Sequence, residues 1–91
     1  MIRLVLLMIF AYIGSARAAC DWGEQAERSG RMNIAVMQYM YCAEEENDAQ
    51  SQYRLGTLFY KGEGLKAPDY RRSAIYYAMS ARNGYAPAQV K

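Results

Sequence analysis

Apolar and small residues recur at helical spacing along the chain from residue 21 onward. Two of the resulting stripes are Ala35, Tyr39 and Cys42, and Ala74, Ala78 and Ala81. Spacings of three and four residues place side chains on one face of a helix, whereas a strand would need alternation of period two, which is absent here. The pattern predicts an all-α fold with helices over residues 21–29, 33–46, 49–61 and 70–83.

Short polar and glycine signals mark the ends of these helices. Gly30 ends the first helix, and Asn47 or Asp48 caps the start of the third. Gly62 follows the third helix at the position where a left-handed residue is needed, and Asp69 caps the fourth. The boundaries therefore agree with the hydrophobic pattern.

The same arrangement of small residues occurs twice. Gly23 precedes Ala35 at the spacing of two packed antiparallel helices, and Gly56 leads to Ala74 and Ala78 with a longer turn. A shift of 39 positions superposes Ala35 on Ala74. Helices approach to about 8 Å only where bulky side chains are missing at the crossing. We therefore expect Gly56 to accept Ala74 or Ala78, in two helical hairpins followed by the opening of a third.

The first nineteen residues differ in composition from the rest. One basic residue, Arg3, precedes an apolar stretch over residues 4–13, and Ala16-Arg17-Ala18 supplies a small-x-small motif. This order is typical of a secretory signal peptide, and the apolar run is shorter than the roughly 20 residues that span a bilayer. We predict a signal peptide over residues 1–19. An uncleaved anchor and a lipid-modified Cys20 remain the alternatives.

Charge argues against a nucleic-acid partner. The chain has 11 basic and 9 acidic residues, and Arg3 and Arg17 both lie in the leader, so the remainder is close to neutral. Nucleic-acid binders usually carry a basic excess. The first half of the remainder is acidic and the second half is basic, which indicates either a complementary binding surface or simply solvated helix faces.

The two cysteines predict a disulfide. With no histidine and only Cys20 and Cys42, the chain has no residues for a zinc site or a Cys-His catalytic pair. If the first two helices fold back near residues 30–32, Cys20 faces Cys42. The crossing of Gly23 with Ala35 places the pairing one turn lower. A bridge closing a loop of about 20 residues would contribute roughly 3 kcal/mol.

The segment Gly62-Glu63-Gly64 resembles a phosphate loop only superficially. Phosphate-binding motifs follow a strand or open a helix with a lysine and a hydroxyl residue. Here a helix precedes the glycines, and Leu65-Lys66-Ala67-Pro68 follows them. We expect Gly62 to end a helix, Gly64 to permit the next turn, and Leu65 to point inward.

Residues 49–89 resemble a Sel1-like repeat, the longer-looped relative of the tetratricopeptide repeat. The matching residues are Leu55, Gly56, Tyr60, Gly62, Gly64, Leu65, Asp69, Tyr70, Ala74, Tyr77, Ala81, Gly84, Ala88 and Gln89. One extra residue between Gly64 and Asp69 departs from the family pattern. Residues 21–46 match the shorter tetratricopeptide pattern less specifically.

The resemblance implies an α-solenoid fragment that binds other proteins and has neither a catalytic site nor a cofactor. It divides the chain into a leader (1–19), a tetratricopeptide-like hairpin (20–46), a Sel1-like repeat (47–86) and the start of a third repeat (87–91). It also implies a binding groove lined by the first helix of each hairpin. The groove residues carried over by position are Gln50, Tyr53, Thr57, Tyr60, Lys61, Glu24, Glu27 and Arg28. The alternative is that Tyr53 and Tyr60 are core residues.

These observations predict a periplasmic or secreted module that binds a partner protein or peptide. The carboxylates of Glu44-Glu45-Glu46 point about 100° apart on a helix and cannot converge on one bond, so we do not expect an enzyme. One alternative is an inhibitor or regulator of an envelope enzyme or sensor that inserts the loop over residues 62–68. The other is a membrane-tethered structural subunit that retains the leader or carries a lipid on Cys20. The open end near residues 85–90 offers a surface for a homodimer.

Overall fold

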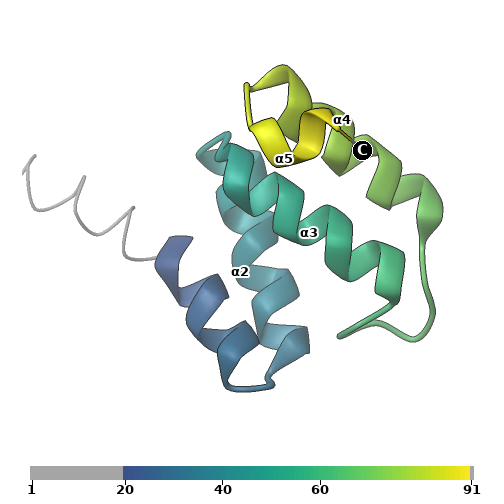
Figure 1. Cartoon of the computed structure of the whole chain (residues 1–91). Coiled ribbons are helices and arrows are strands. Elements are labelled where there is room, and N and C mark those ends of the chain that lie inside the picture. The colour runs from purple at the N-terminus through teal and green to yellow at the C-terminus, as the bar shows by residue number, and fades with distance from the viewer. Residues whose placement is uncertain (1–19, 91) are drawn as a thin grey trace, which may run out of the picture.

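The fold was analysed in a computed structural model, which describes residues 20–90. Those residues contain helices and turns and no strand (Figure 1). A first helical segment covers residues 20–28 and is followed by α2 (Met32–Glu45), α3 (Ala49–Lys61), α4 (Tyr70–Arg82) and α5 (Ala86–Gln89). The four predicted helices are confirmed to within one residue at each end, and the predicted leader over residues 1–19 lies outside the described residues.

Local signals explain where the helices begin and end. Asp48 caps α3 by accepting a hydrogen bond from the Ser51 backbone N–H at 3.0 Å, and Asp69 caps α4 by accepting from the Arg72 backbone N–H at 3.0 Å. Gly62 ends α3 with a φ of 77°, a left-handed conformation that costs glycine little. The predicted roles of Gly62 and Asp69 are confirmed.

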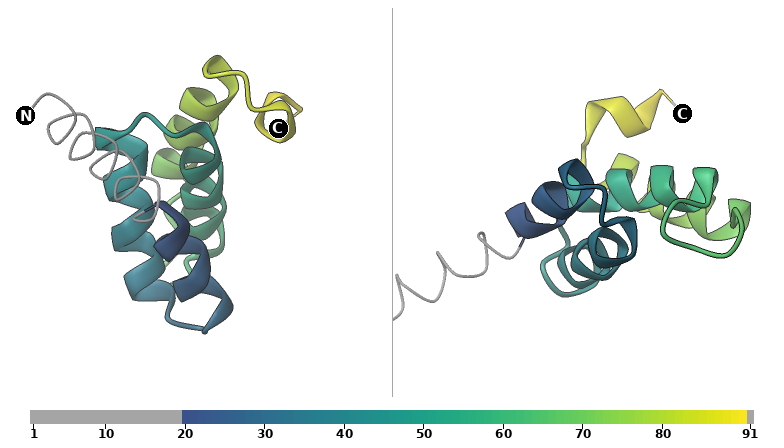
Figure 2. Two further views of the ribbon diagram at one scale, coloured as in Figure 1. Left: turned by 90° about the vertical axis from the view of Figure 1, so that its left-hand side faces the viewer. Right: turned by 90° about the horizontal axis from the view of Figure 1, so that it is seen from below.

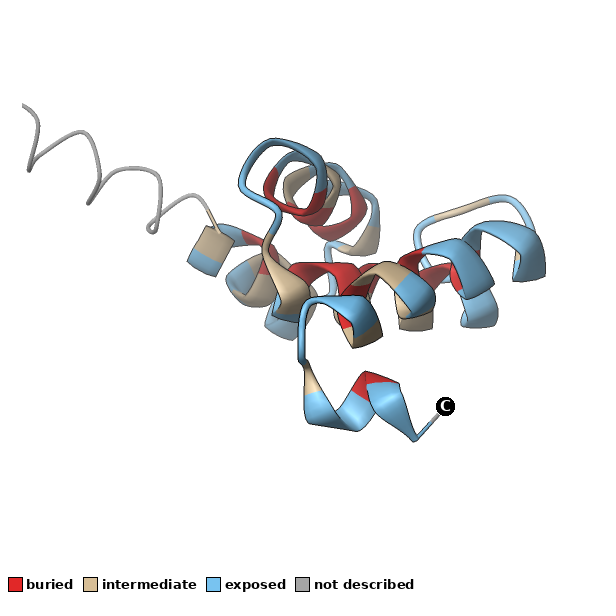
Figure 3. Ribbon diagram, turned by 90° about the horizontal axis from the view of Figure 1, so that it is seen from above, coloured by how far each residue is buried: buried red, intermediate tan, exposed pale blue. Residues whose placement is uncertain are grey.

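The helices pack in sequence order. α3 contacts both α2 and α4, and α5 contacts α4. Figure 2 shows α2, α3 and α4 side by side, with α5 displaced to one side of α3 and α4. The core lies where α2, α3 and α4 face one another, and the outer helix faces are exposed (Figure 3).

Aromatic and aliphatic side chains of all three long helices fill this core. Leu55 and Phe59 of α3 are almost completely buried, as is Tyr39 of α2. The Phe59 ring stacks on that of Tyr76 of α4, with 5.6 Å between ring centroids. Burying a side chain of this size contributes about 1.5–3 kcal/mol, so α3 is the element on which the fold depends most.

The glycines pack against tyrosine rings rather than against alanines. A Cβ atom added to Gly23 would lie 2.7 Å from Cδ1 of Tyr39, and one added to Gly56 would lie 2.9 Å from Cδ1 of Tyr77. Ala74 and Ala78 are exposed, so the expectation that they meet Gly56 is wrong. A flat ring, which can lie against bare backbone, takes the place predicted for a small side chain.

The repeated contact between a glycine and a tyrosine ring also shows which residues of the two hairpins are equivalent. Tyr39 and Tyr77 are 38 positions apart, whereas Gly23 and Gly56 are 33 apart, and the difference is the longer loop of the second hairpin. The shift of 39 positions read from the sequence is therefore one residue too long for α2 and α4. With the correct shift, the buried Ala35 of α2 corresponds to the buried Ser73 of α4.

The loop over residues 62–68 is held against the first hairpin. Gly64 has a φ of 78°, and a Cβ atom there would lie 2.6 Å from the carbonyl carbon of Met32. Leu65 packs against the core, as expected. Gly64 is thus needed both for its left-handed conformation and for the close approach of its backbone to the start of α2.

Two further connections tie the hairpins together. Cys20 and Cys42 form the predicted disulfide, with 5.5 Å between their Cα atoms. The fully buried Gln52 donates to the backbone oxygen of Ala43 at 3.2 Å and to Asn47 at 3.0 Å, and accepts from Asn83 Nδ2 at 2.8 Å. This amide network joins α2, α3 and the end of α4 and satisfies the buried polar atoms of Gln52.

Candidate functional site

A groove of about 740 Å³ opens between the end of α3, the exposed side of α4, and α5. It is lined mainly by aromatic rings and alanines. The lining residues are Tyr60, Tyr70, Ser73, Ala74, Tyr77, Ala78, Ala81, Ala88 and Gln89. The alanines predicted to form a helix crossing instead form the floor of this groove.

Five tyrosines lie in and beside the groove in two ring clusters, which we together call the tyrosine surface: Tyr53, Tyr77 and Tyr85, and Tyr60 and Tyr70. The rings of Tyr53 and Tyr77 lie 5.4 Å apart, those of Tyr53 and Tyr85 lie 5.2 Å apart, and those of Tyr60 and Tyr70 lie 5.3 Å apart. These are the tilted contacts that aromatic pairs favour. Tyr60 and Tyr70 are the most open, with 59% and 63% of their surface exposed.

A hydrogen bond fixes the middle of the tyrosine surface. Thr57 Oγ1 and Tyr77 Oη lie 2.7 Å apart, and Thr57 also donates to the backbone oxygen of Tyr53 at 3.2 Å. Tyr77 is therefore held on two sides, by Thr57 and by the ring of Tyr53. The Tyr77 ring is thus fixed within the fold, independently of any ligand.

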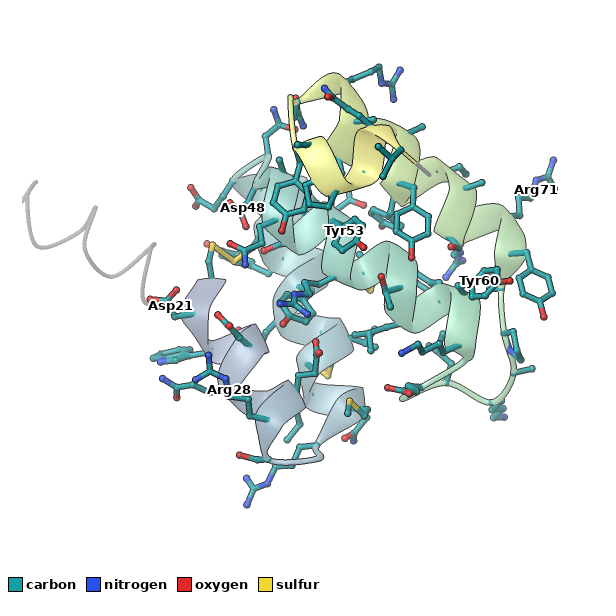
Figure 4. The ribbon with its side chains drawn as sticks, in the orientation of Figure 1. Asp21, Arg28, Asp48, Tyr53, Tyr60 and Arg71 are labelled. Carbon is teal, nitrogen blue, oxygen red and sulfur yellow. A yellow bond between two sulfur atoms is a disulfide. The ribbon has the colours of Figure 1, made fainter. Side chains whose placement is uncertain are left out.

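Of the residues predicted to line a groove, Tyr60 lines this one, whereas Tyr53 and Thr57 contact Tyr77 beside it. Figure 4 shows Tyr53 and Tyr60 projecting from α3 beside α4 and α5. Gln50 and Lys61 are exposed on α3, about 60° and 80° around the helix from Tyr53, and neither lines the groove. They belong to a neighbouring polar stripe.

The acidic and basic residues of the first helical segment lie apart from the groove. Arg28 pairs with Glu24 at 2.8 Å on the surface of that segment, away from Tyr53 and Tyr60 in Figure 4. Glu27 accepts a hydrogen bond from Tyr39 Oη at 3.0 Å and lies 3.8 Å from Arg54. The structure therefore gives Glu27 an internal role and places Glu24, Glu27 and Arg28 outside the tyrosine-lined groove.

Tyr70 and Tyr77 line the groove but were not among the residues predicted to do so, whereas Tyr85 belongs to the open end predicted as a binding surface. A signal for them exists, because Tyr70, Ala74, Tyr77 and Ala81 recur at spacings of three and four on one face of α4. The alanines of that face are predicted to pack against α3, whereas in the described residues Ala74 and Ala78 are exposed and line the groove.

Two other tyrosines are buried against carboxylates. Burial, together with Glu27, raises the pKa of Tyr39 well above its usual value. Burial also raises the pKa of Tyr76 to about 12, helped by the hydrogen bond that its hydroxyl donates to Glu44 at 2.6 Å. Both hydroxyls stay protonated at neutral pH, so they act as hydrogen-bond donors within the fold.

No group of three or more His, Cys, Asp or Glu side chains in residues 20–90 could hold a metal ion. No helix within the same residues is long and apolar enough to cross a membrane.

Comparison with protein-family models, with curated proteins and with solved structures found no match to this chain. The groove and the chemistry of its lining are therefore the basis for a functional interpretation.

Proposed function

We propose that this chain is an exported protein-binding module that holds a segment of a partner protein in the tyrosine-lined groove. In this proposal the two hairpins are tetratricopeptide-like units, the second of Sel1-like type, as the sequence resemblance implies. The observation that carries the proposal is the open groove, with the rings of Tyr60 and Tyr70 exposed beside an alanine floor. Its volume lies within the range of about 300–1,000 Å³ that is usual for ligand sites.

Tyrosine suits this role for physical reasons. Each ring brings a large contact area and a polar tip, and few rotatable bonds lose freedom when a ligand binds. Because Thr57 and Tyr53 already hold Tyr77 in place, part of the ordering cost is removed before binding. A preordered aromatic wall favours recognition of a partner over chemistry on a substrate.

The disulfide supports export. Bridges between cysteines persist in oxidising compartments, such as the periplasm or the extracellular space. The Cys20 sulfur is bonded to Cys42, and a sulfur in a disulfide cannot also carry a lipid thioether. We therefore propose that Cys20 serves as a structural cysteine; removal of the leader is proposed from its sequence pattern alone.

The alternative of an inhibitor that inserts its loop is less well supported. Residues 62–68 do not project freely, because Gly64 lies against the backbone of Met32 and the Asp69 N–H donates to the Phe59 oxygen at 2.8 Å. A loop held at both ends would have to leave the core in order to enter a target. The groove requires no such rearrangement.

The proposal is tested by selecting binding peptides with the oxidised protein. A displayed random library is screened against residues 20–91, and the selected peptides are labelled and measured by fluorescence anisotropy. We expect saturable binding that becomes at least about tenfold weaker in a Tyr60→Ala/Tyr70→Ala variant, since one aromatic anchor commonly contributes more than about 1 kcal/mol. Both residues are exposed, so the fold should survive.

The matched control is Met37→Ser. Met37 lies on α2, 68% exposed, and does not line the groove. Peptides that bind the control and the tyrosine variant equally well would refute the proposed site. A library that yields no peptide above background would refute the proposed function.

A further inference from the structure

Asn83 and Gly84, at the end of α4, form the only Asn-Gly pair of the sequence. An asparagine side chain can be attacked by the backbone nitrogen of the next residue, and glycine hinders this approach least because it has no Cβ atom. Gly84 has a φ of 85°, and a Cβ atom added there would have no neighbour within 4 Å. Asn83 is exposed, so the turn has room for the ring that such an attack closes.

The other two asparagines of the sequence lack this arrangement. Asn33 precedes the branched Ile34, and Asn47 precedes Asp48, whose backbone N–H donates to the Cys42 oxygen at 3.1 Å. A side chain on the following residue obstructs the approach of its nitrogen to the asparagine. Asn33 and Asn47 therefore serve as internal references for the reactivity of Asn83.

Two sets of hydrogen bonds hold Asn83 away from reaction. Its Nδ2 donates to Gln52 Oε1 at 2.8 Å and to Asn47 Oδ1 at 3.1 Å, within the amide network formed by Asn47, Gln52 and Asn83. The Gly84 N–H, whose nitrogen would make the attack, donates to the Ala81 oxygen at 3.0 Å. The attack thus requires the last turn of α4 to open, and local opening is easiest at the ends of helices.

We propose that Asn83 is a site of spontaneous deamidation, whose rate the amide network controls and whose product disrupts that network. The Gly84 nitrogen forms a bond to Cγ of Asn83, the bond between Cγ and Nδ2 breaks, and Nδ2 leaves as ammonia with the proton of the Gly84 N–H. Water then adds across one of the two C–N bonds of the succinimide ring, which yields aspartate or isoaspartate. No step requires an oxidant, a cofactor or a second protein.

The product cannot make the hydrogen bonds of its precursor. An ionised aspartate at position 83 has no N–H to donate, so its carboxylate would face Gln52 Oε1 and Asn47 Oδ1. Gln52 cannot turn its own amide toward the carboxylate without losing its bonds to the Ala43 oxygen, at 3.2 Å, and to Asn47, at 3.0 Å. Because Gln52 is fully buried, an unpaired oxygen there destabilises the fold.

Isoaspartate would also lengthen the main chain between α4 and α5. The Tyr85 N–H donates to the Ser80 oxygen at 3.1 Å, and Gln89 Nε2 donates to the Ala81 oxygen at 3.2 Å. A methylene group added to the backbone between these residues would displace the bonds on its far side. Since Ala88 and Gln89 line the groove, deamidation would change the groove wall as well as the amide network.

Incubating the oxidised protein in warm, neutral buffer made with heavy-oxygen water provides the test. Opening of the ring places heavy oxygen in the product, so mass spectrometry separates residues converted during the incubation from earlier damage. Cleavage after lysine yields the peptide 67–91, which contains Asn83 and no other asparagine. The same protein unfolded in guanidinium chloride gives the rate without the fold. We expect labelled aspartate and isoaspartate at residue 83, formed faster than at Asn33 or Asn47 and more slowly than in the unfolded protein.

A variant at Asn47 tests the control by the amide network. Asn47→Gly removes one acceptor of Asn83 and keeps the backbone, because Asn47 has a φ of 50°, which glycine adopts freely. It should raise the rate in the folded protein by about fivefold, the change in the open fraction expected from the loss of one hydrogen bond, and leave the unfolded rate unchanged. Gln50→Ala is the matched control, because Gln50 is exposed on α3 and lies outside the network.

A second variant presents the normally linked product directly. Asn83→Asp should shift the folding equilibrium at the wild-type urea midpoint by about tenfold toward the unfolded state, because it leaves Gln52 Oε1 without its donor. Asn33→Asp makes the same change of charge outside the network. Since Asn33 lies in the first turn of α2, where a negative charge is favourable, this control should not be destabilised.

Three outcomes overturn the inference. The first is a folded protein with no labelled product at residue 83 after the unfolded sample has reacted completely. The second is an equal rate in the folded wild type and in Asn47→Gly. The third is an equal urea midpoint for Asn83→Asp and the wild type. None of these measurements involves a ligand, so the inference and the proposed function fail independently of each other.

Discussion

Replacing Gly56 by alanine tests the packing of α3 on α4. Alanine is favoured over glycine within a helix by about 1 kcal/mol. Against this, the new Cβ atom would lie 2.9 Å from Cδ1 and 3.0 Å from Cε1 of Tyr77. Tyr77 cannot simply step aside, because Thr57 bonds its hydroxyl and Tyr53 packs on its ring. Overpacking of this kind costs about 1–3 kcal/mol, so we expect Gly56→Ala to lower the free energy of unfolding by about 1 kcal/mol.

The effect of Gly56→Ala on the free energy of unfolding should change sign when the Tyr77 ring is absent. In a Tyr77→Ala background the clash disappears and the helix preference remains, so Gly56→Ala should raise the free energy of unfolding by about 1 kcal/mol. The coupling energy of the cycle is then roughly 2 kcal/mol. Urea unfolding of the oxidised protein, followed by far-ultraviolet circular dichroism, measures all four species. Stabilisation by Gly56→Ala in the wild-type background would refute the packing described here.

Three further predictions concern other parts of the fold. Removing the disulfide with Cys20→Ala/Cys42→Ala should lower the free energy of unfolding by about 3 kcal/mol, because the bridge closes a sequence separation of 22 residues; an unchanged urea midpoint would argue against the bridge. Gly64→Ala should lower it by roughly 2–4 kcal/mol, through its left-handed backbone and the contact with Met32, and equal stability would show that the loop moves freely. An unfolded tyrosine ionises near pH 10, whereas the pKa of the folded Tyr76 is about 12, so between these values the unfolded state releases a proton that the folded state keeps. Stability should therefore fall as the pH rises from about 10 to 12, and Tyr76→Phe should reduce that slope; equal slopes would contradict the assignment.

Helix positions could be predicted from the sequence because their signals are local. Asp48 and Asp69 cap the helices that follow them, and Gly62 ends α3 through its own backbone conformation. The disulfide followed from the same local information, since folding back at residues 30–32 brings Cys20 opposite Cys42. The helix boundaries do not depend on which distant residues meet, and the disulfide required only the return of two consecutive helices.

The partners of the glycines could not be predicted in this way. Gly56 and Ala74 lie at a spacing that suits a helix crossing, but a rotation of α4 by less than one turn brings Tyr77 to the glycine instead. That rotation also directs Ser73 to the backbone oxygen of Gly56, at 2.7 Å. Small residues in a sequence indicate that two helices approach closely, but they do not identify which residue of the second helix lies against the glycine.

The groove depends on the same rotation. When Ser73 and Tyr77 face α3, Ala74 and Ala78 lie about 60° and 100° around α4 from Tyr77, beside the contact with α3 rather than in it. The sequence predicted that Tyr53 and Tyr60, on the first helix of the second hairpin, line a groove. Tyr70 and Tyr77 recur on one face of α4 in the same sequence, but they were not predicted to line it. The groove follows from this rotation of α4, which leaves Ala74 and Ala78 exposed beside α5.

The approach of Gly64 to Met32 has a consequence for how the chain comes apart. A simple stack of hairpins can fray from one end, since each unit touches only its neighbour through one helix face. Here the second hairpin reaches back with both its loop and the side chain of Gln52, so neither hairpin keeps all its contacts when the other opens. Melting should therefore occur as a single cooperative transition, and a nick in the exposed loop would loosen the first hairpin as well as the second.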